Sequence, residues 1–459
     1  MASTKKPTST EAEGPVQYKS VQCIAEAYAD LAVRLETFLV QTIQPGQTLL
    51  LALSGGLDSR VLLDLLVNMR TVLGFKLQAM HVHHGLSPNA DDWTEFCRQL
   101  CGSNQVLFEV VRVKVRRDSG HGLEAAARKE RYQALLASAA DYVVLAHHRD
   151  DQAETLLLQL LRGAGVKGLS AMATRDADRR LLRPLLDVPR AALEAYALSH
   201  QLQWIEDESN LDHGYDRNFL RHQILPELAR RFPAAQETLA RSAAHMAEAA
   251  LLLEELASED AQRHIHDNLL DTAGLAGLSE PRARNLLRWW LSANKVALPS
   301  AIRLQEMLRQ LLSAKPDASL KIKLDHACLR RYLGMAYLNF EIVCQPVTLV
   351  WQGEASLTLP DNSQLLFQRE MGLGLALNKA AKLRISAREG GERFKPDRER
   401  PTRTLKHLLQ EAQMPPWLRE RLPLIYCEDT LAVVPGIGVA CELQAKHEEM
   451  GLVIAWQQA

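Results

Sequence analysis

The stretch Leu50-Leu51-Ala52-Leu53-Ser54-Gly55-Gly56-Leu57-Asp58-Ser59 decides the fold of this chain. An apolar strand runs into a glycine-rich turn, and a helix is expected to leave that turn over residues 58–70. Glycines let the backbone approach a ligand closely, and unpaired N–H groups at the start of a helix attract phosphate. No lysine follows the glycines, so the turn is not the phosphate loop of kinases and GTPases. The pattern predicts a nucleotide site of another type, with an ordinary strand–turn–helix junction as the plainer alternative.

Length and charge limit what the chain can be. At 459 residues it is too long for one ordinary core, so we expect two or three domains. A net charge of -1 excludes a protein that is basic throughout, so any nucleic acid must meet local basic patches. The first 20 residues are polar, and no apolar run later in the chain is long enough for a membrane span. We therefore expect neither a signal peptide nor a membrane partner, and a cytoplasmic protein.

Seven cysteines are scattered along the chain and form no C-x-x-C pair. Cys97 and Cys101 fall on one face of a helix expected over residues 90–101. A redox or metal role is one interpretation, and small buried thiols are the commoner one. An odd, scattered set of cysteines is typical of a reducing compartment.

Strand and helix patterns alternate through the first half of the chain. Such alternation predicts right-handed crossovers and a mainly parallel, doubly wound α/β sheet with helices on both faces. Ligands bind such sheets at the carboxyl ends of the strands. Three polar clusters fall there: Ser54-Gly55-Gly56, His83-His84-Gly85 and residues 147–151. The strands expected after the first are 75–83, 106–113 and 142–146, and the helices are 90–101, 124–137 and 152–161.

The character of the sequence changes near residue 226. Helical patterns dominate to about residue 345, although residues 320–342 alternate like strands. Short strand patterns follow, with one helix expected over 404–413. We therefore expect four parts: a tail over 1–20, a catalytic domain over 21–225, a mostly helical domain over 226–345 and a small α/β domain over 346–459.

The segment His147-His148-Arg149-Asp150-Asp151-Gln152-Ala153-Glu154-Thr155 is the second strong motif. Asp151 and Glu154 lie three apart on one helix face, where two carboxylates can hold Mg²⁺ through oxygen or a substrate ammonium by charge. The alternative is a helix N-cap at Asp150 or Asp151, with Glu154 in the capping-box position. Both interpretations can hold together.

Paired arginines form the third signal. Arg128 and Arg131 are one turn apart, in a stretch that by itself is an ordinary solvated helix face. Arg217 and Arg221 are four apart and could grip phosphates from one helix face. Ion pairs with the acids just upstream are the alternative for the second pair.

A local excess of positive charge marks the last domain. Between residues 382 and 406, nine basic side chains stand against four acidic ones. Because phosphate contacts dominate RNA affinity, RNA binding is one interpretation, and a solvated surface is the other. Trp417, in Pro415-Pro416-Trp417-Leu418-Arg419, lies beside this run and is either exposed or part of the core.

Together these motifs resemble those of the bacterial tRNA(Ile)-lysidine synthases, in the long form with two C-terminal domains. The resemblance runs from about residue 47 to residue 456. It implies the fold of the N-type ATP pyrophosphatases, whose PP-loop is the Ser-Gly-Gly-x-Asp-Ser turn. Ala164 departs from the pattern, since serine or threonine is frequent at its place. The matching stretches are residues 54–59, 81–86, 124–132, 147–155, 162–169, 183–186, 204–221 and 415–419.

Members of that family attach lysine to C2 of the wobble cytidine in the isoleucine tRNA with a CAU anticodon. The reaction passes through an adenylated cytidine, releases pyrophosphate and AMP, and changes the tRNA from methionine to isoleucine specificity. The resemblance implies ATP and Mg²⁺ as cofactors, with this tRNA and L-lysine as partners. It admits a homodimer as one assembly.

The resemblance also implies roles for individual residues. Arg128 would stabilise the charged transition state or position the base, and Arg217 would lie near the phosphates or the cytidine. Asp58 and Asp151 would hold Mg²⁺, while Asp151 and Glu154 are open to either the metal or the lysine ammonium. The implied ATP-binding residues are Ser54, Gly55, Gly56, Leu57, Asp58, Ser59 and His83. The implied tRNA-binding residues are Arg221, Arg393, Lys395, Arg403, Lys406 and Arg419.

Three other functions match part of this motif set. A PP-loop thiolase would put sulfur on a base, but such enzymes typically use paired cysteines, and none lies beside a motif in this sequence. An amidotransferase-linked synthetase would need a glutaminase domain or partner and no basic third domain. A non-catalytic tRNA-binding protein would not need intact residues 54–59 and 151–154.

Replacing Asp58 tests the nucleotide assignment. We expect Asp58→Ala to abolish pyrophosphate release, because a carboxylate that would hold Mg²⁺ is lost, and to leave tRNA binding nearly intact. Pyrophosphate release and tRNA binding are the two measurements. Normal turnover by this variant would remove the PP-loop assignment.

The basic stretch has its own test. We expect Arg393→Ala combined with Lys395→Ala to weaken tRNA binding and to flatten its salt dependence, because fewer phosphate contacts release fewer counterions. Binding constants measured over a salt series supply the slope. An unchanged slope would count against this patch.

Overall fold

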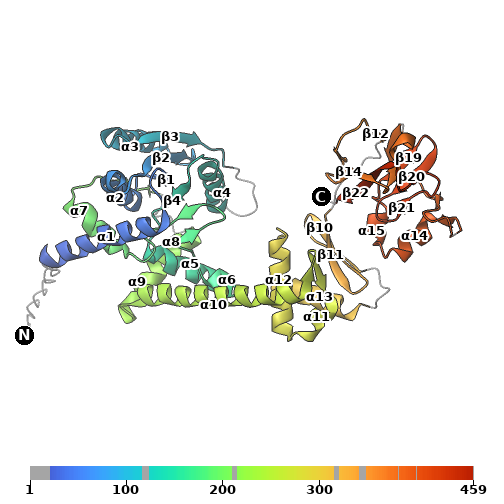
Figure 1. Cartoon of the computed structure of the whole chain (residues 1–459). Coiled ribbons are helices and arrows are strands. Elements are labelled where there is room, and N and C mark those ends of the chain that lie inside the picture. Colours follow the sequence, from blue (N-terminus) through green and yellow to red (C-terminus); the bar gives the residue numbers. More distant parts are fainter. Residues whose placement is uncertain are drawn as a thin grey trace, which may run out of the picture. The chain divides into compact units, whose positions relative to one another are not determined.

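The computed structural model describes residues 21–115, 123–208, 214–314, 320–340, 348–380, 382–399 and 401–457. The tail expected over residues 1–20, the expected boundary at 345 and Arg400 of the basic stretch lie outside the described residues. The chain divides into two compact units, Met1–Glu254 and Glu255–Ala459 (Figure 1). The four-part division expected from the sequence stays a prediction.

A six-stranded sheet forms the frame of the first unit. Its strands are β1 (Thr48–Ala52), β2 (Lys76–His83), β3 (Leu107–Arg112), β4 (Tyr142–Val144), β5 (Arg175–Asp176) and β6 (Leu181–Leu182). The order is β3-β2-β1-β4-β6-β5, with parallel neighbours from β3 to β6 and with β5 antiparallel to β6. The mainly parallel α/β sheet predicted from the sequence is confirmed.

Helices cover both faces of this sheet. The helices up to and across the end of the first unit are α1 (Val21–Thr42), α2 (Leu57–Leu73), α3 (Ala90–Ser103), α4 (Leu123–Leu136), α5 (Arg149–Leu161), α6 (Val166–Leu169), α7 (Arg190–Ser199), α8 (Asp216–Phe219), the π-helix η2 (Leu220–Ile224), α9 (Leu225–Arg231) and α10 (Ala235–His264). Leu49 and Leu51 of β1 pack with α1, α2, α3 and α7, whereas Leu50 packs with Leu135 of α4. Side chains alternate between the faces of a strand, so a strand buried on both faces is apolar throughout.

Helix α5 begins earlier than the sequence suggested. Its N-cap is His148, and the backbone N–H of His148 donates to Asp151 Oδ2 at 3.0 Å. The expectation of an N-cap at Asp150 or Asp151 is wrong, because both residues lie in the first turn. The Asp151 carboxylate therefore caps the helix from inside, and Glu154 follows one turn later.

The second unit starts with helices and a five-stranded antiparallel sheet, where the sequence predicted mostly helix. The helices are α11 (Thr272–Gly277), α12 (Glu280–Ala293) and α13 (Ala301–Ser313). The strands are β7 (Ile265–His266), β8 (Leu269–Asp271), β9 (Lys321–Lys323), β10 (Ala327–Tyr332) and β11 (Met335–Phe340), in the order β7-β8-β11-β10-β9. Strands β9 to β11 account for the alternation seen over residues 320–342.

Strands dominate the rest of this unit, as predicted. They are β12 (Leu349–Val350), β13 (Ser356–Thr358), β14 (Gln364–Met371), β15 (Leu375–Ala376), β16 (Leu383–Ser386), β17 (Arg393–Phe394), β18 (Arg403–Thr404), β19 (Leu424–Cys427), β20 (Thr430–Val434), β21 (Gly438–Val439) and β22 (Met450–Gln457). Three sheets result, ordered β12-β16-β19-β20-β21, β13-β14-β22-β15 and β17-β18. The helix expected over 404–413 is α14 (Leu405–Glu411), and α15 (Pro416–Arg419) and the 3-10 turn η3 (Leu377–Lys379) are also present.

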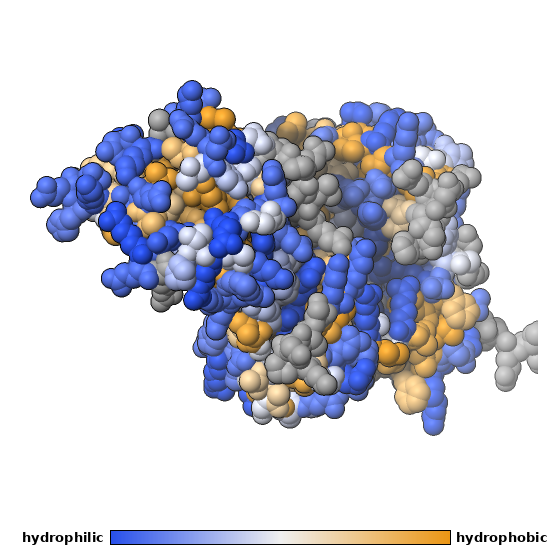
Figure 2. All heavy atoms as spheres, turned by 90° about the vertical axis from the view of Figure 1, so that its right-hand side faces the viewer, coloured by the Kyte–Doolittle hydropathy of each residue, from blue (hydrophilic) through white to orange (hydrophobic). Residues whose placement is uncertain are grey.

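Hydrophilic residues surround separate apolar groups on the face shown in Figure 2. Charged residues make up 24% of the chain, and long charged side chains are rarely buried unless they are paired. Within the described residues, none of the helices combines the length and the apolarity needed to cross a membrane.

Candidate active site

The PP-loop, residues 54–59, follows β1 at the carboxyl edge of the sheet and leads into α2. Gly55 has a φ of +87°, and a Cβ built on it would lie 2.7 Å from Ile205 Cδ1. A side chain at this position would be strained by the backbone and by its neighbour, so the turn requires glycine. The Ser54 and Ser59 hydroxyl oxygens lie 3.0 Å apart, within hydrogen-bond distance. The two serines therefore hold the ends of the loop together.

One buried histidine joins the PP-loop to the start of α5. His148 Nε2 lies 3.6 Å from Asp58 Oδ2 and 3.5 Å from Asp151 Oδ2, and the residue is 1% exposed. Burial lowers the pKa of His148, but the hydrogen bond to Asp58 and the nearby carboxylate charges outweigh burial, so the pKa is raised. The imidazole thereby brings together two carboxylates that lie far apart in the sequence.

Asp58 has an oxygen available for a magnesium ion, whereas both oxygens of Asp151 already accept hydrogen bonds. Asp58 Oδ1 is buried and has no hydrogen-bond partner among the described residues. Mg²⁺ is usually held by one or two carboxylates together with substrate phosphates and water. Asp58 therefore fits the role of a magnesium ligand, and a role of Asp151 toward the metal stays a prediction.

Two arginines from a distant segment neutralise the acids of α5. Arg217 donates from Nε to Glu154 Oε2 at 2.6 Å and from Nη2 to Asp151 Oδ1 at 2.7 Å. Arg221 donates from Nε to Glu154 Oε1 at 2.6 Å and from Nη2 to Asp151 Oδ1 at 3.1 Å. Arg217 and Arg221 thus form ion pairs, as the alternative interpretation held. Their partners are Asp151 and Glu154 of α5, however, and not the acids just upstream of Arg217 that the sequence suggested. The roles of both arginines toward phosphate, cytidine and tRNA stay predictions.

Pairing controls the protonation of these groups. Burial raises the pKa of Asp151, but His148 and Arg217 outweigh burial, so the pKa lies well below its ordinary value. Burial lowers the pKa of Arg221, but Glu154 outweighs burial, so the pKa is raised. Asp151 and Arg221 therefore stay charged at neutral pH.

A cationic cluster surrounds Tyr132 and consists of Arg128, Arg131 and Arg183. The guanidinium carbons of Arg128 and Arg131 lie 5.2 and 5.8 Å from the centroid of the Tyr132 ring. Burial raises the pKa of Tyr132, but the three cations outweigh burial, so the pKa is lowered. Burial lowers the pKa of His147 to about 3, so this neighbour is neutral. Arg128 therefore belongs to a group of cations that favours negative charge.

Arg183 and His148 stand in motifs of the sequence analysis, which gave neither residue a role. Arg183 is 4% exposed and donates from Nη1 to the Ala173 carbonyl at 2.6 Å. Its one signal was its place in Arg183-Pro184-Leu185-Leu186, a stretch with no evident chemistry of its own. The position of His148 depends on the contact with Asp58, which no local spacing reveals.

His83, expected among the ATP-binding residues, ends β2 and is 7% exposed. Its Nε2 lies 3.3 Å from Asp91 Oδ1 and 3.3 Å from Arg112 Nη1, on the neighbouring α3 and β3. These two side chains hold the imidazole at the carboxyl edge of the sheet. A role of His83 toward ATP stays a prediction.

The two neighbouring cysteines are buried thiols, which is the commoner of the two interpretations. Cys97 and Cys101 are both 0% exposed, and burial raises the pKa of their thiols to about 12 and about 11. Cys97 Sγ lies 3.7 Å from His81 Nδ1 and would lie 3.1 Å from a Cβ at Gly55. Within the described stretches, no group of three or more His, Cys, Asp or Glu residues could hold a metal ion.

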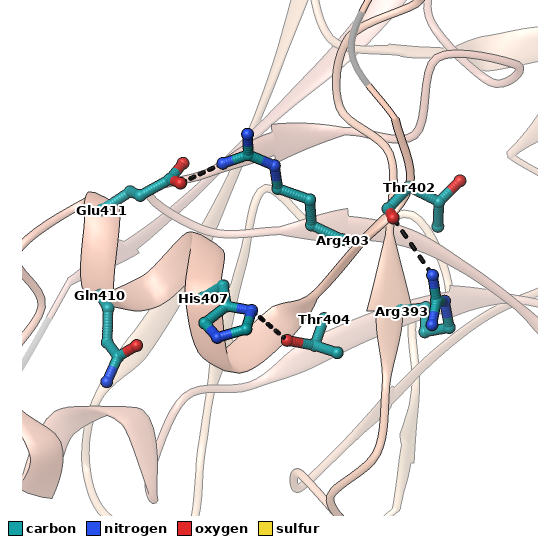
Figure 3. A pocket seen from close by; sticks show the side chains of 7 residues that line it. All are labelled: Arg393, Thr402, Arg403, Thr404, His407, Gln410 and Glu411. Atoms are coloured by element: carbon teal, nitrogen blue, oxygen red, sulfur yellow. Dashed lines mark hydrogen bonds and ion pairs between the residues drawn. The ribbon is translucent and has the colours of Figure 1, made fainter.

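Four predicted tRNA-binding residues of the second unit lie close together. Arg393, Lys395, Arg403 and Lys406 belong to the β17–β18 ribbon, its flank and α14. Arg393 and Arg403 line a cavity of about 460 Å³, shown in Figure 3. The contact of these four residues with RNA stays a prediction.

Arg419 lies elsewhere, at the end of α15. Its Nε donates to the Met414 carbonyl at 2.6 Å, and its Nη2 donates to the Tyr332 hydroxyl at 3.1 Å. Trp417 is 8% exposed and meets the Tyr337 ring edge-on, with centroids 5.2 Å apart, so Trp417 belongs to the core. Arg419 thus ties α15 to β10, and its role toward tRNA stays a prediction.

Comparison with known proteins gives concordant matches. Family models match the PP-loop domain over residues 27–228, the TilS substrate binding domain over 270–337 and the TilS substrate C-terminal domain over 383–456. The chain is 46% identical to the tRNA(Ile)-lysidine synthase of Nitrosomonas europaea, over 90% of this chain and 93% of that protein. It is 42% identical to the synthase of Azoarcus sp., over 92% and 95%. It is 39% identical to the synthase of Coxiella burnetii, over 90% and 94%.

Gly55 and Gly56 form a matched pair for testing the PP-loop geometry. We expect Gly55→Ala to destabilise the fold by about 1–3 kcal/mol and to abolish nucleotide binding, because alanine is strained at positive φ and collides with Ile205. Gly56 has a φ of -73°, and a Cβ there would lie 3.5 Å from Ser54 Oγ, so Gly56→Ala should melt near the wild-type temperature. Thermal unfolding measures both variants. Equal stability of the two would contradict the strain argument.

Proposed function

Because the chain belongs to the tRNA(Ile)-lysidine synthase family, we propose that it joins L-lysine to C2 of the wobble cytidine in the CAU-anticodon isoleucine tRNA. ATP is the second substrate and is split into AMP and pyrophosphate. The modified tRNA pairs with A instead of G and is charged with isoleucine instead of methionine. The observation that carries the proposal is the 46% identity over 90% of the chain. His148 lies close both to Asp58 of the PP-loop and to Asp151 of α5, and this arrangement agrees with the proposal.

In the first step the cytidine O2 attacks the α-phosphorus of ATP, and an O–P bond forms as pyrophosphate leaves with the bonding electron pair. The PP-loop would hold the phosphates, with Asp58 and Asp151 as the ligands of Mg²⁺. The metal, when bound, offsets negative charge on the phosphates. Arg128, in the cationic cluster, would stabilise the same charge or position the base.

In the second step the lysine ε-amine attacks C2, forms a C–N bond and expels AMP. The amine must lose a proton first. Glu154 would accept it, because the low pKa of Asp151 makes that carboxylate a poor base. Both acids are occupied by Arg217 and Arg221 in the structure. The lysine ammonium would therefore take over at least one of these contacts, which selects a cationic nucleophile.

The tRNA would also meet the second unit. Its basic side chains Arg393, Lys395, Arg403 and Lys406 would bind backbone phosphates. The target cytidine must leave the anticodon stack to reach the carboxyl edge of the sheet, as in other enzymes that act on a base. The enzyme would act in the cytoplasm, and a homodimer is compatible with this scheme.

The test is pyrophosphate release by the purified protein with ATP and the CAU-anticodon isoleucine tRNA, with and without lysine. We expect release that depends on this tRNA, with radiolabelled lysine ending on the RNA. Release without lysine incorporation would contradict lysidine formation and favour another PP-loop modification such as thiolation. No release at all would contradict the ATP chemistry.

A further inference from the structure

A cavity of about 460 Å³ lies on the second unit, lined by the β17–β18 ribbon and α14 (Figure 3). Arg393 and Arg403 contribute guanidinium groups, and Thr402 and Thr404 contribute hydroxyl groups. His407 contributes an imidazole and Gln410 contributes an amide. Glu411 is the one carboxylate among the described lining residues. Every lining group except that carboxylate can donate a hydrogen bond to an anion. The cavity therefore suits a negatively charged ligand.

The two arginines of the cavity differ in the partners of their guanidinium groups. Arg403 reaches toward the end of α14 and forms an ion pair with Glu411 (Figure 3). Arg393 donates to the Thr402 carbonyl at 3.2 Å and forms no ion pair within the described part of the chain. The side chains of Arg403 and Glu411 are 41% and 49% exposed, and an ion pair so exposed contributes little stability. Another anion can therefore replace Glu411.

We propose that this cavity binds one phosphate of the tRNA backbone and that Glu411 is an internal competitor, which holds Arg403 until a correctly placed phosphate displaces it. The inference rests on the proposed function, because tRNA is its ligand. Carboxylate and phosphate oxygens accept the same paired N–H donors of a guanidinium, so the two anions compete for Arg403. Arg393 lies on the same cavity and supplies a second cation for the phosphate.

Competition of this kind lowers the affinity of the cavity for RNA. A well-placed phosphate gains both guanidinium groups, but it must first break the Arg403–Glu411 ion pair. The apparent affinity is therefore reduced by the fraction of molecules in which this pair is closed. An RNA that places no phosphate at the cavity is affected less. Glu411 thus sets the affinity of the cavity for a correctly placed phosphate.

The test is Glu411→Gln in the full-length protein, with tRNA binding measured over a salt series. The two ligands are the isoleucine tRNA and the methionine tRNA that also carries a CAU anticodon. We expect the isoleucine tRNA to bind roughly two- to five-fold tighter, because its phosphate no longer has to displace Glu411. The methionine tRNA should change less, because a misplaced RNA leaves Arg403 unused in both proteins.

Glu420→Gln is the matched control. Glu420 is exposed on the same unit and makes no ion pair among the described residues, so its replacement removes the same charge without releasing Arg403. Arg403→Gln supplies the second control, because Glu411→Gln should have no further effect on that background if it acts through Arg403. Thermal unfolding of each variant establishes that it is folded.

Three results would overturn the proposal. They are a Glu411→Gln effect equal to that of Glu420→Gln, an effect that persists without Arg403, and displacement of RNA by inorganic phosphate far beyond chloride at equal ionic strength. The last would assign the cavity to free phosphate instead of RNA. Lysine incorporation by the wild-type protein, measured in parallel, separates these failures from failure of the proposed function.

Discussion

The site depends on one constraint, which is that two carboxylates buried on α5 need cations beside them. Asp151 and Glu154 are 6% and 1% exposed, and burying a charge without a partner costs several kcal/mol. Arg217 and Arg221 supply the cations from a segment that follows α5 by more than fifty residues. The ion pairs therefore hold α8 and η2 against α5, so these two helices line one side of the site.

In the proposed reaction the same ion pairs would constrain how lysine binds. A guanidinium makes charge-assisted, often paired, hydrogen bonds with a carboxylate, and an ammonium competes as a point charge. Asp151 and Glu154 accept bonds from both arginines, so a lysine ammonium reaches them only when at least one guanidinium moves. Phosphate is the other anion that arginine binds well. In the proposed reaction, an ATP phosphate that reached Arg217 or Arg221 would release a carboxylate for lysine, which would couple the binding of the two substrates.

The sequence predicted what short-range patterns determine and missed what distant contacts determine. The PP-loop and the parallel strands were predicted because strands buried on both faces are apolar runs and the turn is contiguous. The start of α5 was placed at residue 152 instead of Arg149, because its cap, His148, is not a typical capping residue. Strands β7 and β8, of 2 and 3 residues, are too short to show a period. The bonds of Arg217 and Arg221 to α5 could not be predicted, since no spacing links them.

Counting charges in a sequence overestimates what a surface offers to RNA. Counting nine basic against four acidic residues gives every cation the same weight. In the structure, the basic side chains described there differ in whether their charge is already paired. The guanidinium of Arg419, just beyond that run, is engaged by Met414 and Tyr332, and that of Arg403 is paired with Glu411. An RNA gains from a paired cation only by displacing its partner, which requires a phosphate in the right place. Acids placed among the basic residues of such a surface therefore lower its general attraction for RNA.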